Sequence, residues 1–244
     1  MIDRLVIPFY RKARRALSRL VALPGKVTCN ICGWQGRKFT DFDCGYSRIY
    51  ADAECPNCRA HPRHRAFYFF LNTALPTDRQ IRLLHFAPES IIEKTFRQYG
   101  NIDYLSVDIE PGRAMQLEDI TRLSFEDDSF DVIFCSHVLE HVEDDKTAMR
   151  ELRRVLKPGG LGVLDVPIDW SRDETYEDPS ITSPEDRTRA YWQHDHLRLY
   201  GRDFPLKLAA AGFSVTVYKL AEHLDEKKRR MHGTGNKTLY LCSK

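Results

Sequence analysis

The sequence predicts an α/β protein in which a parallel sheet with helices on both faces follows a small metal-binding module. Three observations support this fold class. The 244 residues are enough for one sizeable α/β domain and a small appendage. From residue 81 onward, apolar runs that suit buried strands alternate with periodic helical segments. Ahead of them, two Cys-x-x-Cys pairs stand out among the seven cysteines.

Composition and charge exclude several classes of protein. Hydrophobic residues make up 42% of the chain and charged residues 30%, as in ordinary soluble globular proteins. The formal net charge of +2 gives no overall field that would favour nucleic acid or an acidic substrate. Arginines interrupt the apolar residues at the N-terminus, and no stretch approaches the roughly eighteen apolar residues of a membrane span. We therefore expect a cytoplasmic protein without a secretion signal or a transmembrane segment.

Residues 1–25 form a basic N-terminal arm with scattered aliphatic side chains. One interpretation is an interfacial helix that gives weak peripheral contact with an anionic membrane. The other is a helix that packs on its own domain and leaves its basic face in water. Pro24 and Gly25 end the arm in either case.

Residues 26–65 have the spacing of a zinc-binding module. A Cys-x-x-Cys turn lets two thiolates converge on one metal ion, and two such turns complete a closed tetrahedral site. So small a segment cannot fold alone, and metal binding would supply the missing free energy. A closed site leaves no position for catalysis, so we expect a structural role; the alternative is four unrelated buried cysteines. The expected zinc ligands are Cys29, Cys32, Cys55 and Cys58.

Basic residues join this module to the rest of the chain. Arg59, His61, Arg63, His64 and Arg65 precede an aromatic and aliphatic run at 66–75, which predicts a buried helix closed by Pro76. Because arginine suits phosphate and carboxylate groups, the basic cluster binds an anionic substrate in one interpretation. In the other interpretation it docks the module onto the main domain.

The main domain, expected at 66–244, shows strand and helix signals in alternation. The apolar segments predict parallel strands at 81–86, 103–108, 131–136 and 161–166. Periodic segments predict helices at 89–99, 144–156 and 201–211, and a final pair of strands is expected at 213–220 and 237–242. The polar stretch 167–200 is too long for a simple connection, and we interpret it as an insert on the substrate side.

Short motifs mark the carboxyl edge of this sheet, where open parallel sheets bind ligands. The second strand ends on Asp108, and a carboxylate can accept hydrogen bonds from both hydroxyls of a ribose. Further along come Asp119, Ser129-Phe130-Asp131, Leu139-Glu140-His141 and, at 156–160, Leu-Lys-Pro-Gly-Gly. In this order the motifs resemble the class I S-adenosylmethionine-dependent methyltransferases of the small type 11 group.

The resemblance covers about residues 81–166. It implies a Rossmann-like, seven-stranded methyltransferase sheet that binds S-adenosylmethionine. By the same resemblance, Asp108 would hold the ribose hydroxyls, and Ile109 would lie against the adenine. Asp119 would accept from the adenine amino group, with the backbone N–H of Ile120 donating to the ring. Ser136 and His137 would border the methionine end and the transferred methyl group.

One loop departs from the pattern of that family, which normally has an acid and then Gly-x-Gly-x-Gly after the first strand. The corresponding residues here contain no glycine, and a proline among them lacks a backbone N–H. Either the loop follows a different path, with Glu89 taking the ammonium group of the cofactor, or cofactor binding has been lost. The contacts expected from this stretch are His85, Ala87, Pro88 and Glu89.

Three histidines are the candidate catalytic residues. Methyl transfer needs alignment of nucleophile and methyl group and sometimes a base, and histidine accepts a proton near neutral pH. His194 and His196 lie in the insert, and His137 follows the strand at 131–136. The alternative is that the histidines of the insert, with Arg198, only tie it to the core.

Three functions remain open. The leading one is methyl transfer to a small molecule or a glycan, with the zinc module helping to cover the substrate. The second is an RNA methyltransferase whose zinc module grips RNA, in which the basic arm would take part. The third is a non-catalytic scaffold that retains the fold without the cofactor. The sequence indicates neither the acceptor atom nor the oligomeric state.

Overall fold

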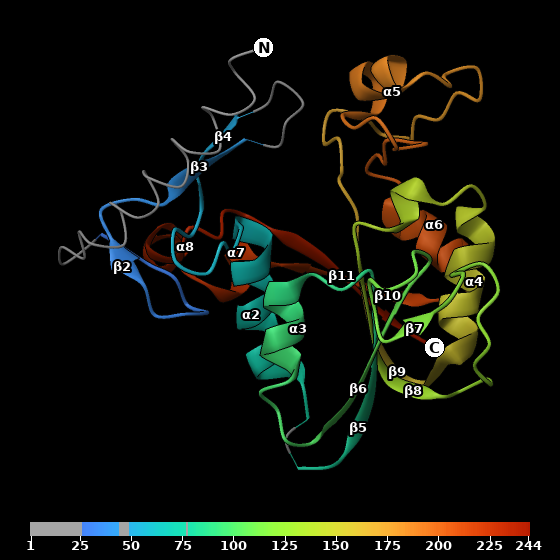
Figure 1. Ribbon diagram of the computed structural model, residues 1–244, viewed down its shortest axis with the longest axis horizontal. Coiled ribbons are helices and arrows are strands. Elements are labelled where there is room, and N and C mark those ends of the chain that lie inside the picture. The colour runs from blue at the N-terminus through green and yellow to red at the C-terminus, as the bar shows by residue number, and fades with distance from the viewer. Residues whose placement is uncertain (1–25, 44–48, 77) are drawn as a thin grey trace. The chain divides into compact units, whose positions relative to one another are not determined.

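The computed structural model describes residues 26–43, 49–76 and 78–244, which form two compact units (Figure 1). The first unit runs through Leu75 and takes in residues 219–237. The second comprises residues 76–218 and 238–244. The expected basic arm at 1–25 lies outside the described residues. Within the described part of the chain, no helix has the length and apolar character needed to cross a membrane.

The first unit combines short antiparallel strands with helices. β1 (Val27–Thr28) pairs with β2 (Gln35–Gly36), and β3 (Thr40–Asp43) pairs with β4 (Ile49–Glu54). The next element, α2 (Pro62–Ala74), starts before the expected residue 66, because Pro62 is well suited to the first helical turn. The unit is completed by α7 (Leu220–His223) and α8 (Glu226–His232), two helices that the sequence pattern does not predict.

The second unit contains the predicted seven-stranded sheet, in the order β10-β11-β9-β8-β5-β6-β7. Its parallel strands are β5 (Ile81–Phe86), β6 (Ile102–Asp108), β7 (Gln116–Leu117), β8 (Phe130–Ser136) and β9 (Leu156–Asp165). β11 (Thr238–Ser243) runs antiparallel to β9 and lies between it and β10 (Ser214–Lys219). The α/β, Rossmann-like fold class is therefore confirmed, and the strand order reverses between β5 and β8.

Helices cover both faces of this sheet (Figure 1). Side chains alternate between the faces along each strand. Phe86 and Ile133 belong to one buried apolar cluster with α4 (Asp145–Val155) and α6 (Phe204–Ala210). On the other face, the rings of His85 and Phe134 contact Phe96 of α3 (Ser90–Phe96). The sheet is thus buried on both sides, as its apolar strands require.

Two local features differ from the prediction. α4 ends at Val155, and β9 begins at Leu156 rather than after Gly160. Pro158 and Gly159 are tolerated within this strand because its register with β8 shifts between Phe130 and Val132. Neither residue therefore has to take part in regular hydrogen bonding between the two strands. The insert at 167–200 contains an unpredicted helix, α5 (Pro184–Tyr191), whose N-cap Ser183 accepts from the Asp186 N–H.

Candidate active site and metal-binding cysteines

A pocket of about 760 Å³ opens at the carboxyl ends of β5, β6 and β8. The strand order reverses here, and this is the place where an open parallel sheet binds ligands. Residues from the ends of all three strands and from the insert line it, including Phe86, Val107 and Gln193. Six residues predicted to contact the cofactor are among the lining residues: Ala87, Asp108, Ile109, Asp119, Ile120 and His137.

The lining of this pocket is acidic and partly apolar. The side chain of Ile109 is 68% exposed and offers an apolar surface to the pocket. Arg113 contributes a positively charged side chain to the lining. Seven carboxylates surround the same space: Asp108, Glu110, Glu118, Asp119, Glu143, Asp144 and Asp195. This charge distribution favours a ligand that carries positive charge.

Asp108 and Asp119 are both oriented by local hydrogen bonds. Oδ1 of Asp108 accepts from the N–H of Glu110 at 2.9 Å. Oδ1 of Asp119 accepts from the N–H of Thr121 at 2.8 Å and from its hydroxyl at 2.7 Å. The bonds from Thr121 lower the pKa of Asp119. Both carboxylates are therefore positioned before any ligand binds.

Two pocket residues have a left-handed backbone although neither is glycine. The φ angle is +44° at Ala87 and +58° at His137. This conformation is unfavourable for a residue with a Cβ atom and persists only where the surrounding structure imposes it, often at ligand sites. Ala87 follows the first strand of the sheet, where the resembled family has its glycines. The chain thus makes a left-handed turn there without a glycine.

Other residues predicted to contact the cofactor do not line the pocket. His85 is 1% exposed, and its Nδ1 lies 2.9 Å from the hydroxyl of Tyr104. Burial lowers the pKa of His85 to about 3. Its side chain points to the opposite face of β5 from Phe86, because successive side chains alternate along a strand. Pro88, Glu89 and the buried Ser136 are likewise not lining residues.

Three histidines surround the buried carboxylate of Glu140. This residue lies in η1 (Leu139–His141), the turn that follows β8. Its Oε1 is 3.2 Å from Nδ1 of His137 and 4.0 Å from Nε2 of His196. Burial alone would raise the pKa of Glu140, but His137, His141 and His196 together hold it below its ordinary value. Sequence reasoning missed Glu140, although an acid between two histidines at the end of a strand was an available signal.

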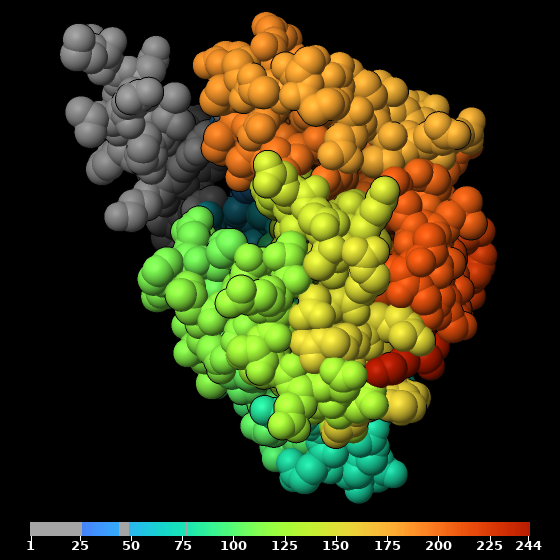
Figure 2. All heavy atoms as spheres, turned by 90° about the vertical axis from the view of Figure 1, so that its right-hand side faces the viewer, coloured from blue at the N-terminus to red at the C-terminus, as the bar shows by residue number. Residues whose placement is uncertain are grey.

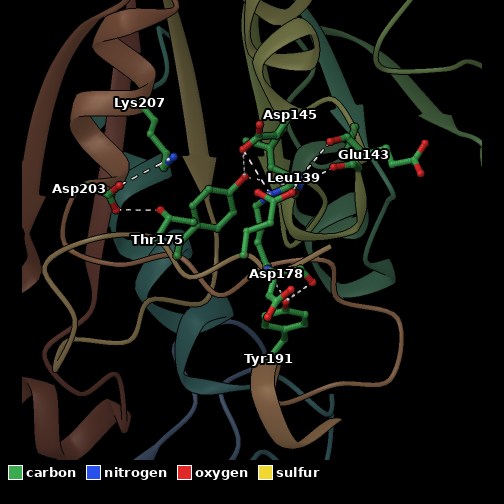
Figure 3. A network of polar contacts seen from close by, with 12 residues as sticks. Leu139, Glu143, Asp145, Thr175, Asp178, Tyr191, Asp203 and Lys207 are labelled. Atoms are coloured by element: carbon green, nitrogen blue, oxygen red, sulfur yellow. Dashed lines mark hydrogen bonds and ion pairs between the residues drawn. The ribbon is translucent and has the colours of Figure 1, made fainter. Parts of the chain in front are cut away.

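The insert is anchored to η1, and this places His196 in the histidine cluster. The guanidinium of Arg198, which is 1% exposed, donates to the carbonyl oxygens of Leu139, Val142 and Glu143. Leu139, Glu143 and Asp145 lie together at this contact in Figure 3. Figure 2 shows the insert, in orange, against the yellow segment that follows β8. The insert is therefore tied to the core, as one of the two alternatives predicted.

Of the three candidate catalytic residues, His137 is the one that lines the pocket. Its backbone N–H donates to the carbonyl of Asp165 at 2.8 Å, and its Nε2 lies 3.8 Å from Oδ2 of the same residue. His196 is 5% exposed, and its Nδ1 contacts the Tyr191 carbonyl. The side chain of His194 is 50% exposed and lies 3.7 Å from Asp195. Neither His194 nor His196 is among the residues that line the pocket.

The four predicted metal ligands converge in the first unit. The Sγ atoms of Cys29 and Cys58 are 3.6 Å apart, and those of Cys32 and Cys55 are 3.7 Å apart. All four sulfurs lie within 4.8 Å of one another. Thiolates bound at about 2.3 Å to a tetrahedral zinc ion are about 3.8 Å apart. The cluster therefore has the donor set and the spacing to hold one such ion.

Arg65 ties the cysteine turns to the rest of the first unit. Its Nη2 donates to the carbonyl oxygens of Ala53 and Gly233 at 2.9 Å each, and its guanidinium stacks on the Phe39 ring at 3.9 Å. Burial lowers the pKa of Arg65 to about 10. Since this side chain is fully buried, Arg65 cannot take the part in binding an anionic substrate that one interpretation of the basic cluster gives it.

Comparisons with known proteins agree with the fold of the sheet unit. Residues 89–164 match a family model described as a methyltransferase domain. An uncharacterised 37.1 kDa protein in transposon TN4556 of Streptomyces fradiae is 36% identical over 133 residues, 52% of this chain and 34% of that protein. A demethylmenaquinone methyltransferase of Streptomyces avermitilis is 50% identical over 54 residues, 22% of this chain and 23% of that enzyme. This chain thus spans about a third or less of these relatives.

A solved structure extends the fold comparison over nearly the whole chain. The [4+2]-cyclase SpnF matches with a TM-score of 0.52 and 14% identity, over 96% of this chain and 93% of that one. Likeness at this level of identity shows a shared fold alone. Residues 89–164 are thus similar to a methyltransferase domain, and the sheet unit shares its fold with this structure.

Proposed function

We propose that this chain is an S-adenosylmethionine-dependent methyltransferase that acts on a small molecule or a glycan. The observation that carries the proposal is the pocket at the switch point of the sheet, which the adenosine-side residues of the family pattern line. Its volume of about 760 Å³ falls within the range of about 300–1,000 Å³ usual for small-ligand sites. When bound, the cofactor supplies an electrophilic methyl group on a sulfonium.

In this proposal the pocket residues share the binding of adenosine. Asp108 accepts hydrogen bonds from the ribose hydroxyls, and Ile109 packs against the adenine. Asp119 accepts from the adenine amino group, beside the backbone of Ile120. The seven carboxylates of the lining suit a cofactor that carries both a sulfonium and an ammonium charge. The left-handed turn at Ala87 supports a route for the chain past the ligand that needs no glycine.

His137 is the residue that we assign to the acceptor side. It lines the pocket, and its ring lies between the buried carboxyl groups of Glu140 and Asp165. The acceptor nucleophile forms a bond to the methyl carbon while the carbon–sulfur bond breaks. His137 accepts the proton that the acceptor loses in this step.

The charge of the pocket favours a neutral or cationic acceptor over RNA, because carboxylates repel phosphates. One feature supports the RNA alternative. A groove of about 670 Å³ in the first unit is lined by Lys26, Arg37, Lys38, Lys227 and Arg230. However, Lys38 pairs with Asp52 and Arg230 pairs with Glu226 on its walls. RNA binding that weakens steeply with increasing salt would favour this alternative.

Calorimetric titration of the zinc-replete chain with S-adenosylmethionine and its demethylated product tests the proposal. We expect binding by the wild type and about 10- to 100-fold weaker binding by Asp108→Ala, the usual effect of losing hydrogen bonds to a charged group. Asp103→Ala is the matched control, because its exposed side chain lies on the same strand outside the pocket. A wild type that binds neither ligand at millimolar concentration would leave the scaffold alternative. The fold alone does not decide between the two, since a structure with this fold is a cyclase.

A further inference from the structure

Glu140, His141 and His196 form a cluster that the methyl transfer described above does not use as a unit. One side-chain ligand atom of each residue lies within 4.8 Å of those of the other two. Glu140 and His196 are buried, whereas His141 lines the pocket. One carboxylate and two imidazoles beside an open space are the donor set of a divalent metal site that keeps positions free for water or substrate.

Glu140 is the unusual member of this cluster. It is 1% exposed, and neither of its oxygens has a hydrogen-bond partner of good geometry. Imidazole nitrogens lie nearby, at 3.2 Å for Nδ1 of His137 and 4.0 Å for Nε2 of His196. Burying a carboxylate in this way is costly unless the group is paired with a cation or coordinates a metal.

One ring nitrogen of each imidazole is already engaged. Nδ1 of His196 lies 2.9 Å from the carbonyl oxygen of Tyr191, and a carbonyl only accepts, so this nitrogen carries the proton. Nε2 of His196 then directs a lone pair toward the Glu140 side. Nδ1 of His141 lies 3.4 Å from Oδ2 of Asp195. In metal-binding histidines, the ring nitrogen that is not on the metal makes such a contact with a carbonyl or carboxylate, and this contact fixes the ring and its tautomer.

The distances suit one ion. Two ligand atoms at about 2.1 Å from the same metal are at most about 4.2 Å apart. The 4.0 Å between Oε1 of Glu140 and Nε2 of His196 already satisfies this limit. The other separations, at most 4.8 Å, need to shorten by less than about 1 Å to meet the same bond lengths.

We propose that Glu140, His141 and His196 bind a divalent first-row transition-metal ion at the wall of the pocket, with Asp195 and the Tyr191 carbonyl orienting the two imidazoles. The free positions of the ion face the pocket on the side of His141. An oxygen of the methyl acceptor would occupy these positions, and the ion would lower the pKa of the acceptor's hydroxyl. The site would therefore select acceptors with a hydroxyl or with vicinal oxygens. This use of the ion rests on the proposed function, whereas ion binding itself does not.

Titration of the zinc-replete full chain with Mn²⁺ alone, followed by the paramagnetic resonance of the free ion, tests the site. Mn²⁺ prefers oxygen ligands to thiolates and therefore does not compete for the four cysteines. We expect one Mn²⁺ per chain and at least about a 10-fold loss of affinity in Glu140→Gln and in His196→Asn. His194→Asn, the neighbouring histidine outside the cluster, should bind as the wild type does.

Absence of binding by the wild type at millimolar Mn²⁺, or equal binding by Glu140→Gln, overturns the proposal. If the variants do not fold, nuclear magnetic resonance of the wild type tests whether Mn²⁺ binds at this site. Mn²⁺ must then broaden the ring protons of His141 and His196 more than those of His194, and equal broadening overturns the site. Titration of the same samples with S-adenosylmethionine separates the two hypotheses. Cofactor binding without Mn²⁺ binding rejects the metal site, and the reverse result rejects the methyltransferase.

Discussion

Asp131, the first acid of β8, shows what a single side chain contributes to this fold. Its Oδ2 accepts from the backbone N–H of Arg82 at 2.9 Å and from Lys157 at 2.8 Å, and its Oδ1 accepts from Arg79 at 2.9 Å. Burial alone would raise its pKa, but these three donors hold it at about 2. One carboxylate thus joins the starts of β5 and β8 to residue 157 of β9.

Asp131 makes the stability of the sheet unit depend on pH. Its pKa is depressed in the folded state, so its contribution is present above the unfolded pKa of about 3.9 and is lost as the pH falls toward 2. We expect Asp131→Asn to lower the free energy of unfolding by about 1–3 kcal/mol at pH 7 and to differ little from the wild type near pH 2. Urea unfolding at a series of pH values measures this, with the exposed Asp103→Asn as control. A difference that stays constant with pH would show that the charge of Asp131 is not the cause.

Single residues also show how far the sequence could predict the site. Asp108 is predictable because it ends a strand at the edge where open parallel sheets bind ligands, whereas Asp119 follows only from the resemblance to a known family. His85 was misplaced, although the alternation of side chains along β5 already separated it from Phe86. Glu140 was missed because its role depends on a histidine 56 positions away, brought close by an anchor that no local pattern reveals.

At the scale of elements, the insert is a closed and well-packed segment. Tyr176 and Leu199 of the insert pair through reciprocal hydrogen bonds, both at 2.9 Å. Thr175 and Lys207 both point toward Asp203 in Figure 3, which joins the insert to α6. A Cβ atom on Gly201 would lie 2.6 Å from the backbone of Glu174, so the chain passes too closely there for another residue. These contacts position His196 as well as Asp195.

Arg198 anchors the insert to the segment that follows β8, and its replacement tests how much this contact stabilises the sheet unit. We expect Arg198→Met to lower the free energy of unfolding of the sheet unit by about 3–5 kcal/mol, because Glu177 and Asp145 lose a buried ionic partner. Arg198→Lys should recover only part of this free energy, since lysine lacks the planar guanidinium that donates to several acceptors at once. Urea unfolding and the rate of proteolytic cleavage within 167–200 provide the measurements. Arg202→Lys, whose side chain is half exposed, is the matched control. Cleavage as slow as in the wild type would refute the anchor.

Elements with strong periodicity were predictable, and short capped helices were not. α4 followed from the spacing of Met149, Leu152 and Val155, which face the core. The helices α5 and α8 are short and mostly polar, so hydrophobic periodicity gave no signal for them. Their caps were visible in the sequence, as Ser183 before Pro184 and as Asp225 with Gly233. Such caps are common enough outside helices that they do not decide a helix alone.

At the scale of the molecule, the two units should respond separately to loss of metal. We expect about one zinc ion per chain and, after chelation, loss of hydrogen-exchange protection in the first unit with the seven-stranded sheet retained. Cys29→Ser should have the same effect. Cys242→Ser is the matched control, because this thiol is buried in β11 outside the cysteine cluster and its loss should destabilise the sheet without changing the zinc content. Zinc content that is unchanged in Cys29→Ser would contradict the four-cysteine site.

The return of residues 219–237 to the first unit has a consequence for synthesis on the ribosome. Nδ1 of His232 lies 2.9 Å from the Thr28 carbonyl, a contact between residues 204 positions apart. At about 5–20 residues per second, Thr28 is made about 10–40 s before its partner exists. Throughout that interval the cysteine turns can be ordered only by contacts with residues that are near them in the sequence or by a metal ion. We therefore expect them to capture their metal while the chain is still growing, long before α8 is available to pack against them.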